Sequence, residues 1–165
     1  MSRLYLRITV DGAVAEAAIP SRQQAREAIL RALSVASPRL ADPQRMVEVS
    51  LALVSNAEIA ALNDQYRQRQ QPTNCLSFPQ DPLPPVFRRD LLGDIVIAPD
   101  VVVGEAADQG KPLMHHYRHL LIHSTLHLLG FDHVDEQEAL IMEQLETRLL
   151  AEMGVADPYL NHIHE

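Results

Sequence analysis

The chain has 165 residues, 47% of them hydrophobic, and a formal net charge of −8 at pH 7. This length suits one domain, which we predict over 1–165 with frayed ends at 1–3 and 155–165. No apolar run approaches the roughly 18 residues of a membrane span, which argues against a membrane protein. Polar and apolar residues alternate at the N-terminus, unlike in a secretory signal. The single cysteine, Cys75, cannot form an internal disulfide, which excludes a disulfide-rich secreted protein. We therefore expect a cytoplasmic protein.

The first half of the chain predicts strands alternating with helices. Hydrophobic residues alternate with polar ones from Leu4 to Val10 and again from Val47 to Leu53, as in half-buried strands. A helix is expected from Pro20-Ser21 to about Ser37, and another from Ser55 to near Arg67. The expected buried positions of these two helices are Ala25, Ala28, Ile29, Leu33, Ile59, Leu62 and Tyr66.

The second half predicts two strands followed by three helices. A short strand is expected at Cys75–Phe78, and an inner strand at Asp94–Ala98 after the proline-rich loop Gln80–Asp90. The three helices are expected from Pro99 to Gly110, from Lys111-Pro112 through the histidines, and from about Asp135 to Met153, the last anchored by Leu140, Leu145 and Leu149. The order β-α-β-α-β-β-α-α-α predicts an α+β domain in which a mixed sheet of about four strands packs with about five helices.

The stretch HSTLHLLGFDH at 123–133 has the spacing of a metal site. His123 and His127 are four residues apart, so a helix points both rings at a common spot. Gly130 can adopt the left-handed conformation that ends a helix and turns the chain, so that His133 completes the set. Three imidazoles with a fourth position open are typical of a catalytic zinc, although histidine also suits nickel or copper.

The same stretch differs from the metzincin protease pattern H-E-x-x-H-x-x-G-x-x-H at one position, where Ser124 replaces the glutamate. That glutamate is the general base of the proteases. The sequence therefore indicates a hydrolytic metal site and argues against ordinary peptide hydrolysis.

A simpler interpretation is a polar helix face that happens to be rich in histidine. His115, His119, His123 and His127 all follow at four-residue steps. Of the histidines outside the proposed triad, His119 is the best candidate for a group that supports the ligands from one turn upstream. Asp132 could orient a ligand histidine, and a surface carboxylate is the alternative.

Charge does not exclude a nucleic-acid substrate. All but one of the 14 basic residues are arginines, a side chain that favours bidentate contact with phosphate. Many of the acidic residues fall in the predicted C-terminal helix, so the rest of the chain is closer to neutral.

Three motifs, in order over about residues 47–133, resemble those of the YbeY family of bacterial metal-dependent endoribonucleases. They are LN at 62–63 with YR at 66–67 and PTNCLSFP at 72–79, LGDIVI at 92–97, and HSTLHLLGFDH at 123–133. The chain departs from the family pattern at Ser124, Phe131 and Asn74-Cys75, none of which is a proposed ligand. Asn74 exchanges a charge for an amide beside the site.

This resemblance implies one zinc ion held by His123, His127 and His133. It also implies a cytoplasmic enzyme that cleaves single-stranded RNA and acts on ribosomal RNA and the small ribosomal subunit, in 16S rRNA 3′-end maturation and ribosome quality control. Arg67 matches the family arginine that faces the metal cleft.

We hypothesise that Arg67 holds the scissile phosphate and offsets charge in the transition state; a solvated cation at a helix C-terminus is the alternative. Arg69 and Arg118, and also Arg88 and Arg89, are candidates for contacting the RNA. The sequence names no general base and does not choose between attack by water and by the 2′-hydroxyl.

Two other functions stay open at the level of sequence. One is a metallohydrolase of another substrate class, such as a peptidase. The other is a ribosome-assembly or RNA-binding factor with a mainly structural zinc, whose loss would unfold the domain. A closed structural site needs four protein ligands, and only three are evident.

Overall fold

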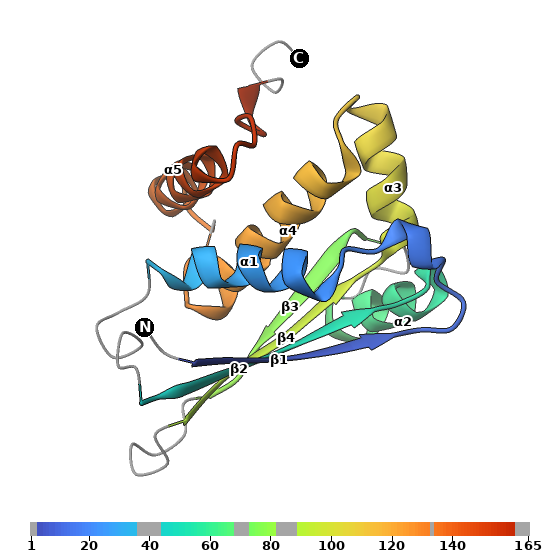
Figure 1. Ribbon diagram of the computed structural model, residues 1–165, viewed down its shortest axis with the longest axis horizontal. Coiled ribbons are helices and arrows are strands. Elements are labelled where there is room, and N and C mark those ends of the chain that lie inside the picture. The colour runs from blue at the N-terminus through green and yellow to red at the C-terminus, as the bar shows by residue number, and fades with distance from the viewer. Residues whose placement is uncertain (1–2, 36–43, 68–72, 82–88, 133, 161–165) are drawn as a thin grey trace.

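The computed structural model describes residues 3–35, 44–67, 73–81, 89–132 and 134–160, and in it one sheet carries helices on both faces (Figure 1). The elements in chain order are β1 (Arg3–Val10), the short 3-10 helix η1 (Glu16–Ala18), α1 (Arg22–Leu33), β2 (Met46–Leu53), α2 (Asn56–Arg67), β3 (Cys75–Pro79), β4 (Arg89–Ile97), α3 (Pro99–Asp108), α4 (Leu113–Leu128) and α5 (Glu136–Glu152). The predicted α+β class, with a mixed sheet of four strands and five helices, is confirmed. None of the described helices is long and apolar enough to span a membrane.

The strands lie in the order β1-β2-β4-β3. β1, β2 and β4 are parallel, whereas β3 runs antiparallel to β4 and forms one outer edge of the sheet. β4 and β3 approach each other closely at Gly93. It has a φ of 139°, and a Cβ there would overlap the backbone oxygen of Phe78.

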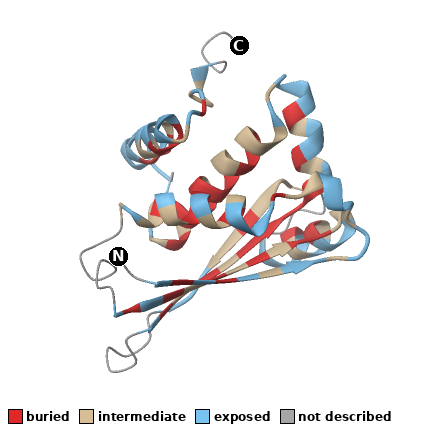
Figure 2. Cartoon of the chain, viewed as in Figure 1, coloured by how far each residue is buried: buried red, intermediate tan, exposed pale blue. Residues whose placement is uncertain are grey.

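Alternation along the strands divides the core between the two faces of the sheet. Val49, Leu51 and Leu53 of β2 point into the larger cluster, which packs under α1 and α4. Ala52 points the other way, into a smaller cluster with Ile59 of α2. Figure 2 shows the buried residues concentrated on the sheet and on the side of α4 that faces it. α4 is therefore held centrally in the fold.

Two predicted helix faces were wrong in part. Tyr66 was expected inside but is 59% exposed, because the last turn of α2 reaches past the cluster formed with Ile59. Leu140 is also exposed, at 55%. The buried face of α5 consists of Met142, Glu146, Leu149 and Leu150. Because one position of that face is a glutamate, the apolar residues alone did not indicate it.

The observed ends of some helices and strands differ from the predicted ones. β4 begins at Arg89, five residues before the expected Asp94, because a buried Asp90 and a register shift opposite Glu48/Val49 break its apolar run. The part of the expected Gln80–Asp90 loop at 82–88 lies outside the described residues. The first helix was expected to reach about Ser37 but ends at Leu33, with Ser34 as its C-cap.

Candidate metal centre

α4 brings two of the three predicted ligands together. The ring centroids of His123 and His127 lie 4.8 Å apart, with the rings tilted by 81°. Both side chains are partly exposed, and together with His119 they line a cleft of about 970 Å³. The four-residue spacing therefore produces the shared face that the sequence predicted.

The turn after α4 also has the predicted form. Gly130 has a φ of 101°, and the Phe131 N–H donates to the Leu126 carbonyl at 3.0 Å, which closes the helix in the pattern of a Schellman motif. Phe131 and Asp132 then return to line the cleft beside His127. The chain is thus redirected toward the histidines immediately before position 133.

The third predicted ligand, His133, lies outside the described residues. Among the residues that are described, no group of three or more His, Cys, Asp or Glu side chains is arranged to hold a metal. The geometry on which a metal site can be argued is therefore that of His123 and His127 with the groups around them.

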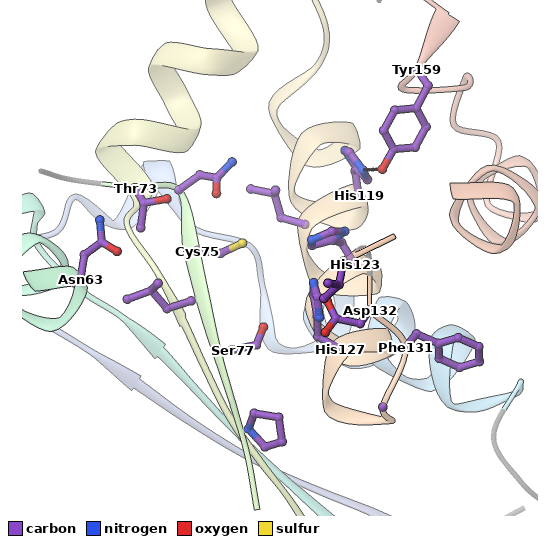
Figure 3. Close-up of a pocket in the computed structure, with 16 residues that line it drawn as sticks. Asn63, Thr73, Cys75, Ser77, His119, His123, His127, Phe131, Asp132 and Tyr159 are labelled. Atoms are coloured by element: carbon purple, nitrogen blue, oxygen red, sulfur yellow. Dashed lines mark hydrogen bonds between the residues drawn. The ribbon is translucent and has the colours of Figure 1, made fainter. Parts of the chain in front are cut away.

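The opposite wall of the cleft is formed by the outer strand β3. Cys75 and Ser77 project from it toward α4, while Asn63 of α2 lines the cleft from the far side of the strand (Figure 3). Asn63 is 4% exposed. The hollow therefore reaches around the outer edge of β3 from the histidine helix to α2.

Glu146, which the sequence pattern did not single out, is a fully buried carboxylate beside His119 and His123. Its Oε1 accepts hydrogen bonds from His119 Nε2 at 2.8 Å, from His123 Nδ1 at 3.2 Å and from the Tyr159 hydroxyl at 2.8 Å. Burial alone would raise the pKa of Glu146, but the hydrogen bonds and charges of the two histidines lower it to about 2. Glu146 is therefore an ionised acceptor at neutral pH.

This carboxylate decides which nitrogen of His123 is available to a metal. An ionised carboxylate accepts hydrogen bonds and donates none, so His123 must carry a proton on Nδ1. In the neutral form of the ring, which is the form that binds a metal, the lone pair is then on Nε2. Neutral histidine bound through one nitrogen, with the other N–H donated to a carboxylate, is the usual arrangement of a zinc ligand. The described residues fit a metal at this position.

His119 stands one turn upstream, where the sequence placed a supporting group. Its ring contacts that of Tyr159 edge-on, with centroids 5.5 Å apart, and its Nε2 lies 3.3 Å from the Tyr159 hydroxyl. Burial lowers the pKa of His119 in spite of the nearby Glu146 carboxylate. Burial and the same carboxylate raise the pKa of Tyr159, which keeps the phenol protonated and able to donate.

One signal in the sequence could have revealed Glu146. It lies four residues after Met142 and three before Leu149, on the buried stripe of α5. A glutamate on an apolar stripe is seldom fully buried without a partner. Its partners, however, come from α4, and the sequence does not state how the two helices dock.

A second polar network fixes the start of β3. Glu105 of α3 accepts from Asn74 Nδ2 at 3.1 Å and from His116 Nε2 at 2.9 Å. Burial raises the pKa of Glu105, but the hydrogen bonds from His116 and Asn74 outweigh it and the net shift is downward. Asn74, a departure from the family pattern, thus uses its amide to bind a carboxylate next to the cleft.

The proposed arginines are not brought to the cleft by the described part of the structure. Arg67 is the last residue of α2, and its side chain, like Arg69 and Arg88, lies outside the described residues. Arg118 is half-buried on α4 and is absent from the lining of the cleft. Arg89 pairs with Glu48 on the neighbouring strand. No described contact assigns a substrate role to Arg118 or Arg89.

Comparison with known proteins identifies relatives along most of the chain. The family model described as "Endoribonuclease YbeY" matches residues 13–154. A curated protein of that name from Chromohalobacter salexigens is 54% identical over 112 residues, which cover 68% of this chain and 72% of the relative. Another, from Cellvibrio japonicus, is 45% identical over 161 residues, covering 96% and 85%.

A solved structure supports the fold independently. The solution structure of TM1509 from Thermotoga maritima superposes with a TM-score of 0.55 at 22% sequence identity, covering 93% of this chain and 98% of that one. At this identity the likeness concerns the fold alone.

Proposed function

Because the chain belongs to the YbeY endoribonuclease family, we propose that it is a zinc-dependent endoribonuclease that cuts single-stranded RNA. We propose further that it acts in the cytoplasm on ribosomal RNA and the small ribosomal subunit, in 16S rRNA 3′-end maturation and ribosome quality control. The family supports an RNA-cleaving hydrolase. The zinc, the ribosomal substrate and the location are proposals.

The observation that carries the zinc proposal is the hydrogen bond from His123 Nδ1 to the buried, ionised Glu146. In the neutral His123 ring this bond puts the lone pair on Nε2, and the ring of His127 lies beside it in a cleft of about 970 Å³. His123, His127 and, by its place in the motif, His133 would hold the ion, which would supply Lewis acidity to the reaction.

Side chains around the proposed metal site have separate roles in orienting a ligand and in binding RNA. Glu146 orients His123, and through its bonds to His119 and Tyr159 it ties α5 and the following segment to α4. Asn63 and Ser77 supply polar groups along the cleft. We assign Arg67 to the scissile phosphate because it matches the family arginine in the YR motif at 66–67.

The test is cleavage of a labelled single-stranded RNA by purified protein, with and without a chelator that removes zinc. Chelation and the variant His127→Ala should each lower the rate by roughly 100-fold or more, because the metal stabilises the transition state by several kcal/mol. Arg67→Ala should lower kcat. The control is His115→Ala, because His115 is on the same helix as His127 but is absent from the cleft lining.

The result separates the candidate functions. RNA that stays intact with a folded, zinc-loaded protein contradicts nuclease action on free RNA and favours the assembly factor. If circular dichroism shows that chelation unfolds the protein, the zinc is mainly structural. Cleavage of precursor small-subunit rRNA in assembled subunits tests the ribosomal substrate.

A further inference from the structure

We propose that Tyr66 and Phe78 form a stacking site for one base of single-stranded RNA, at the rim of the cleft that contains His123 and His127. This inference rests on the proposed RNA-cleaving function. It adds a binding site on the far side of β3 from the histidines.

The two rings form a supported aromatic pair. Their centroids are 5.1 Å apart and their planes are inclined by 65°, the edge-to-face arrangement that aromatic pairs prefer. Phe78 is partly buried against the smaller core cluster, so packing fixes the position of its ring. Tyr66 is 59% exposed and rests against Phe78. The result is an aromatic surface whose orientation is set before any ligand arrives.

The pair is continuous with the cleft. Asn63, which lines the cleft, precedes Tyr66 by three residues and therefore lies one turn away on the same side of α2. On β3, the neighbours of Phe78 on both sides, Ser77 and Pro79, also line the cleft. A strand of RNA leaving the histidines can thus cross the outer edge of β3 and reach Tyr66.

The surroundings favour a nucleobase over the apolar face of a protein partner. Among the described side chains of α2, Tyr66 is the one large hydrophobic group that is exposed. The positions beside it on α2 are polar: Asn63 lies one turn before it, and Asp64 and Gln65, both exposed, directly precede it. A protein interface generally needs a wider apolar patch. A base has a flat apolar face and charged phosphates on each side, which suits a single ring among polar groups.

Steady-state cleavage of a single-stranded oligoadenylate by the zinc-loaded enzyme gives the first test. Tyr66→Ala should raise KM by roughly 5- to 100-fold, the range expected for one lost stacking contact. The value of kcat should change little, because a base held away from the scissile bond contributes equally to the ground state and the transition state. Tyr66→Phe should keep the original KM.

Tyr5→Ala is the matched control, since Tyr5 is 51% exposed on β1, at the other edge of the sheet. A fall in kcat with unchanged KM for Tyr66→Ala would overturn the stacking site and assign Tyr66 to positioning the neighbouring Arg67. An unchanged KM and kcat would overturn it as well.

A second measurement reports on stacking directly and does not require cleavage. The chain contains no tryptophan, so Tyr66→Trp introduces a single fluorescent indole. Placed in a His127→Ala background, it should be quenched on addition of oligoadenylate and much less by an abasic chain of equal length. Equal quenching by the two chains would contradict base stacking.

The two proposals can fail separately. If the wild-type protein cuts no RNA, the proposed function fails, and the indole experiment still reports whether bases stack at position 66. If the wild-type protein cuts RNA and neither measurement responds at position 66, the stacking site alone is wrong.

Discussion

Glu146 Oε1 lies 3.2 Å from Nδ1 of His123, although the two residues are 23 positions apart on different helices. Since Glu146 is fully buried and also accepts from His119 and Tyr159, one oxygen atom joins α4, α5 and the segment after α5. The orientation of the His123 ring is thus fixed by a residue on the last described helix.

Replacing this carboxylate should weaken zinc binding. In Glu146→Gln the side chain keeps its shape but loses its charge, so its hold on the protonated Nδ1 of His123 weakens and the ligand is less basic. Loss of such an outer partner typically lowers metal affinity by roughly 10- to 100-fold. Competition with a chromophoric zinc chelator measures the change. Glu143→Gln, exposed on the same helix, should leave the affinity as it is; an equal fall in both variants would contradict the role of Glu146.

A side chain at position 93 should destabilise the protein. A Cβ in Gly93→Ala would lie 3.0 Å from Cα of Pro79 and overlap the oxygen of Phe78, and the φ of 139° is unfavourable for alanine. Backbone strain of this kind costs about 1–3 kcal/mol even before the overlap is counted. Thermal unfolding should therefore show a Tm lower by roughly 5–10 °C.

Gly104→Ala, in contrast, should stabilise the protein. Gly104 lies in α3, and a Cβ there meets nothing within 4 Å. Alanine should stabilise the helix by about 0.5–1 kcal/mol. If both glycine variants changed the Tm by the same amount, the close approach of β3 to β4 would not be the cause at position 93.

The buried pair of Arg45 and Asp90 should be costly to break and inexpensive to replace. The Arg45 guanidinium bonds both carboxylate oxygens of Asp90, with Nη2–Oδ1 at 3.2 Å, and the side chains are 10% and 7% exposed. Asp90→Ala leaves a buried cation and should cost about 3–5 kcal/mol of unfolding free energy. The double variant Arg45→Met with Asp90→Leu should recover most of that loss. Urea denaturation measures both, and failure of the double variant to recover would show that the pair is itself stabilising.

Glu105 should contribute a pH-dependent part of the stability. Although burial raises its pKa, hydrogen bonds from His116 and Asn74 hold the pKa below the ordinary value of 4.5. A carboxylate with a lowered pKa stabilises the fold above its unfolded pKa, and that stability is lost as the pH falls toward the folded value. The difference in urea midpoint between wild type and Glu105→Gln should therefore be larger at pH 7 than at pH 4. Asp108→Asn, exposed on the same helix, is the control, and a difference independent of pH would contradict the prediction.

The strands and the histidine helix could be predicted because their signals are local. Val47 to Leu53 alternate, and His123 and His127 repeat at the helical period, so each pattern is complete within one element. Gly130 was predicted to turn the chain on its own conformational freedom, and its φ of 101° agrees.

Features that depend on how elements dock could not be predicted. Glu146 becomes the partner of His123 only when α5 packs against α4, and its own position looked like part of a charged surface. The exposure of Tyr66 depends on where the face of the sheet ends. Gly93 was recognised only as part of a motif, and its physical reason, the backbone of Phe78, belongs to another strand.

The order of these residues along the chain also bears on unfinished copies of the protein. Synthesis proceeds from the N-terminus, so His123 and His127 leave the ribosome before Glu146 does. A polypeptide interrupted ahead of α5 carries both imidazoles with no carboxylate to orient them, and on the proposed function it binds zinc poorly. On the proposed function, a chain synthesised only as far as α4 should therefore have little nuclease activity toward the ribosomal RNA around it.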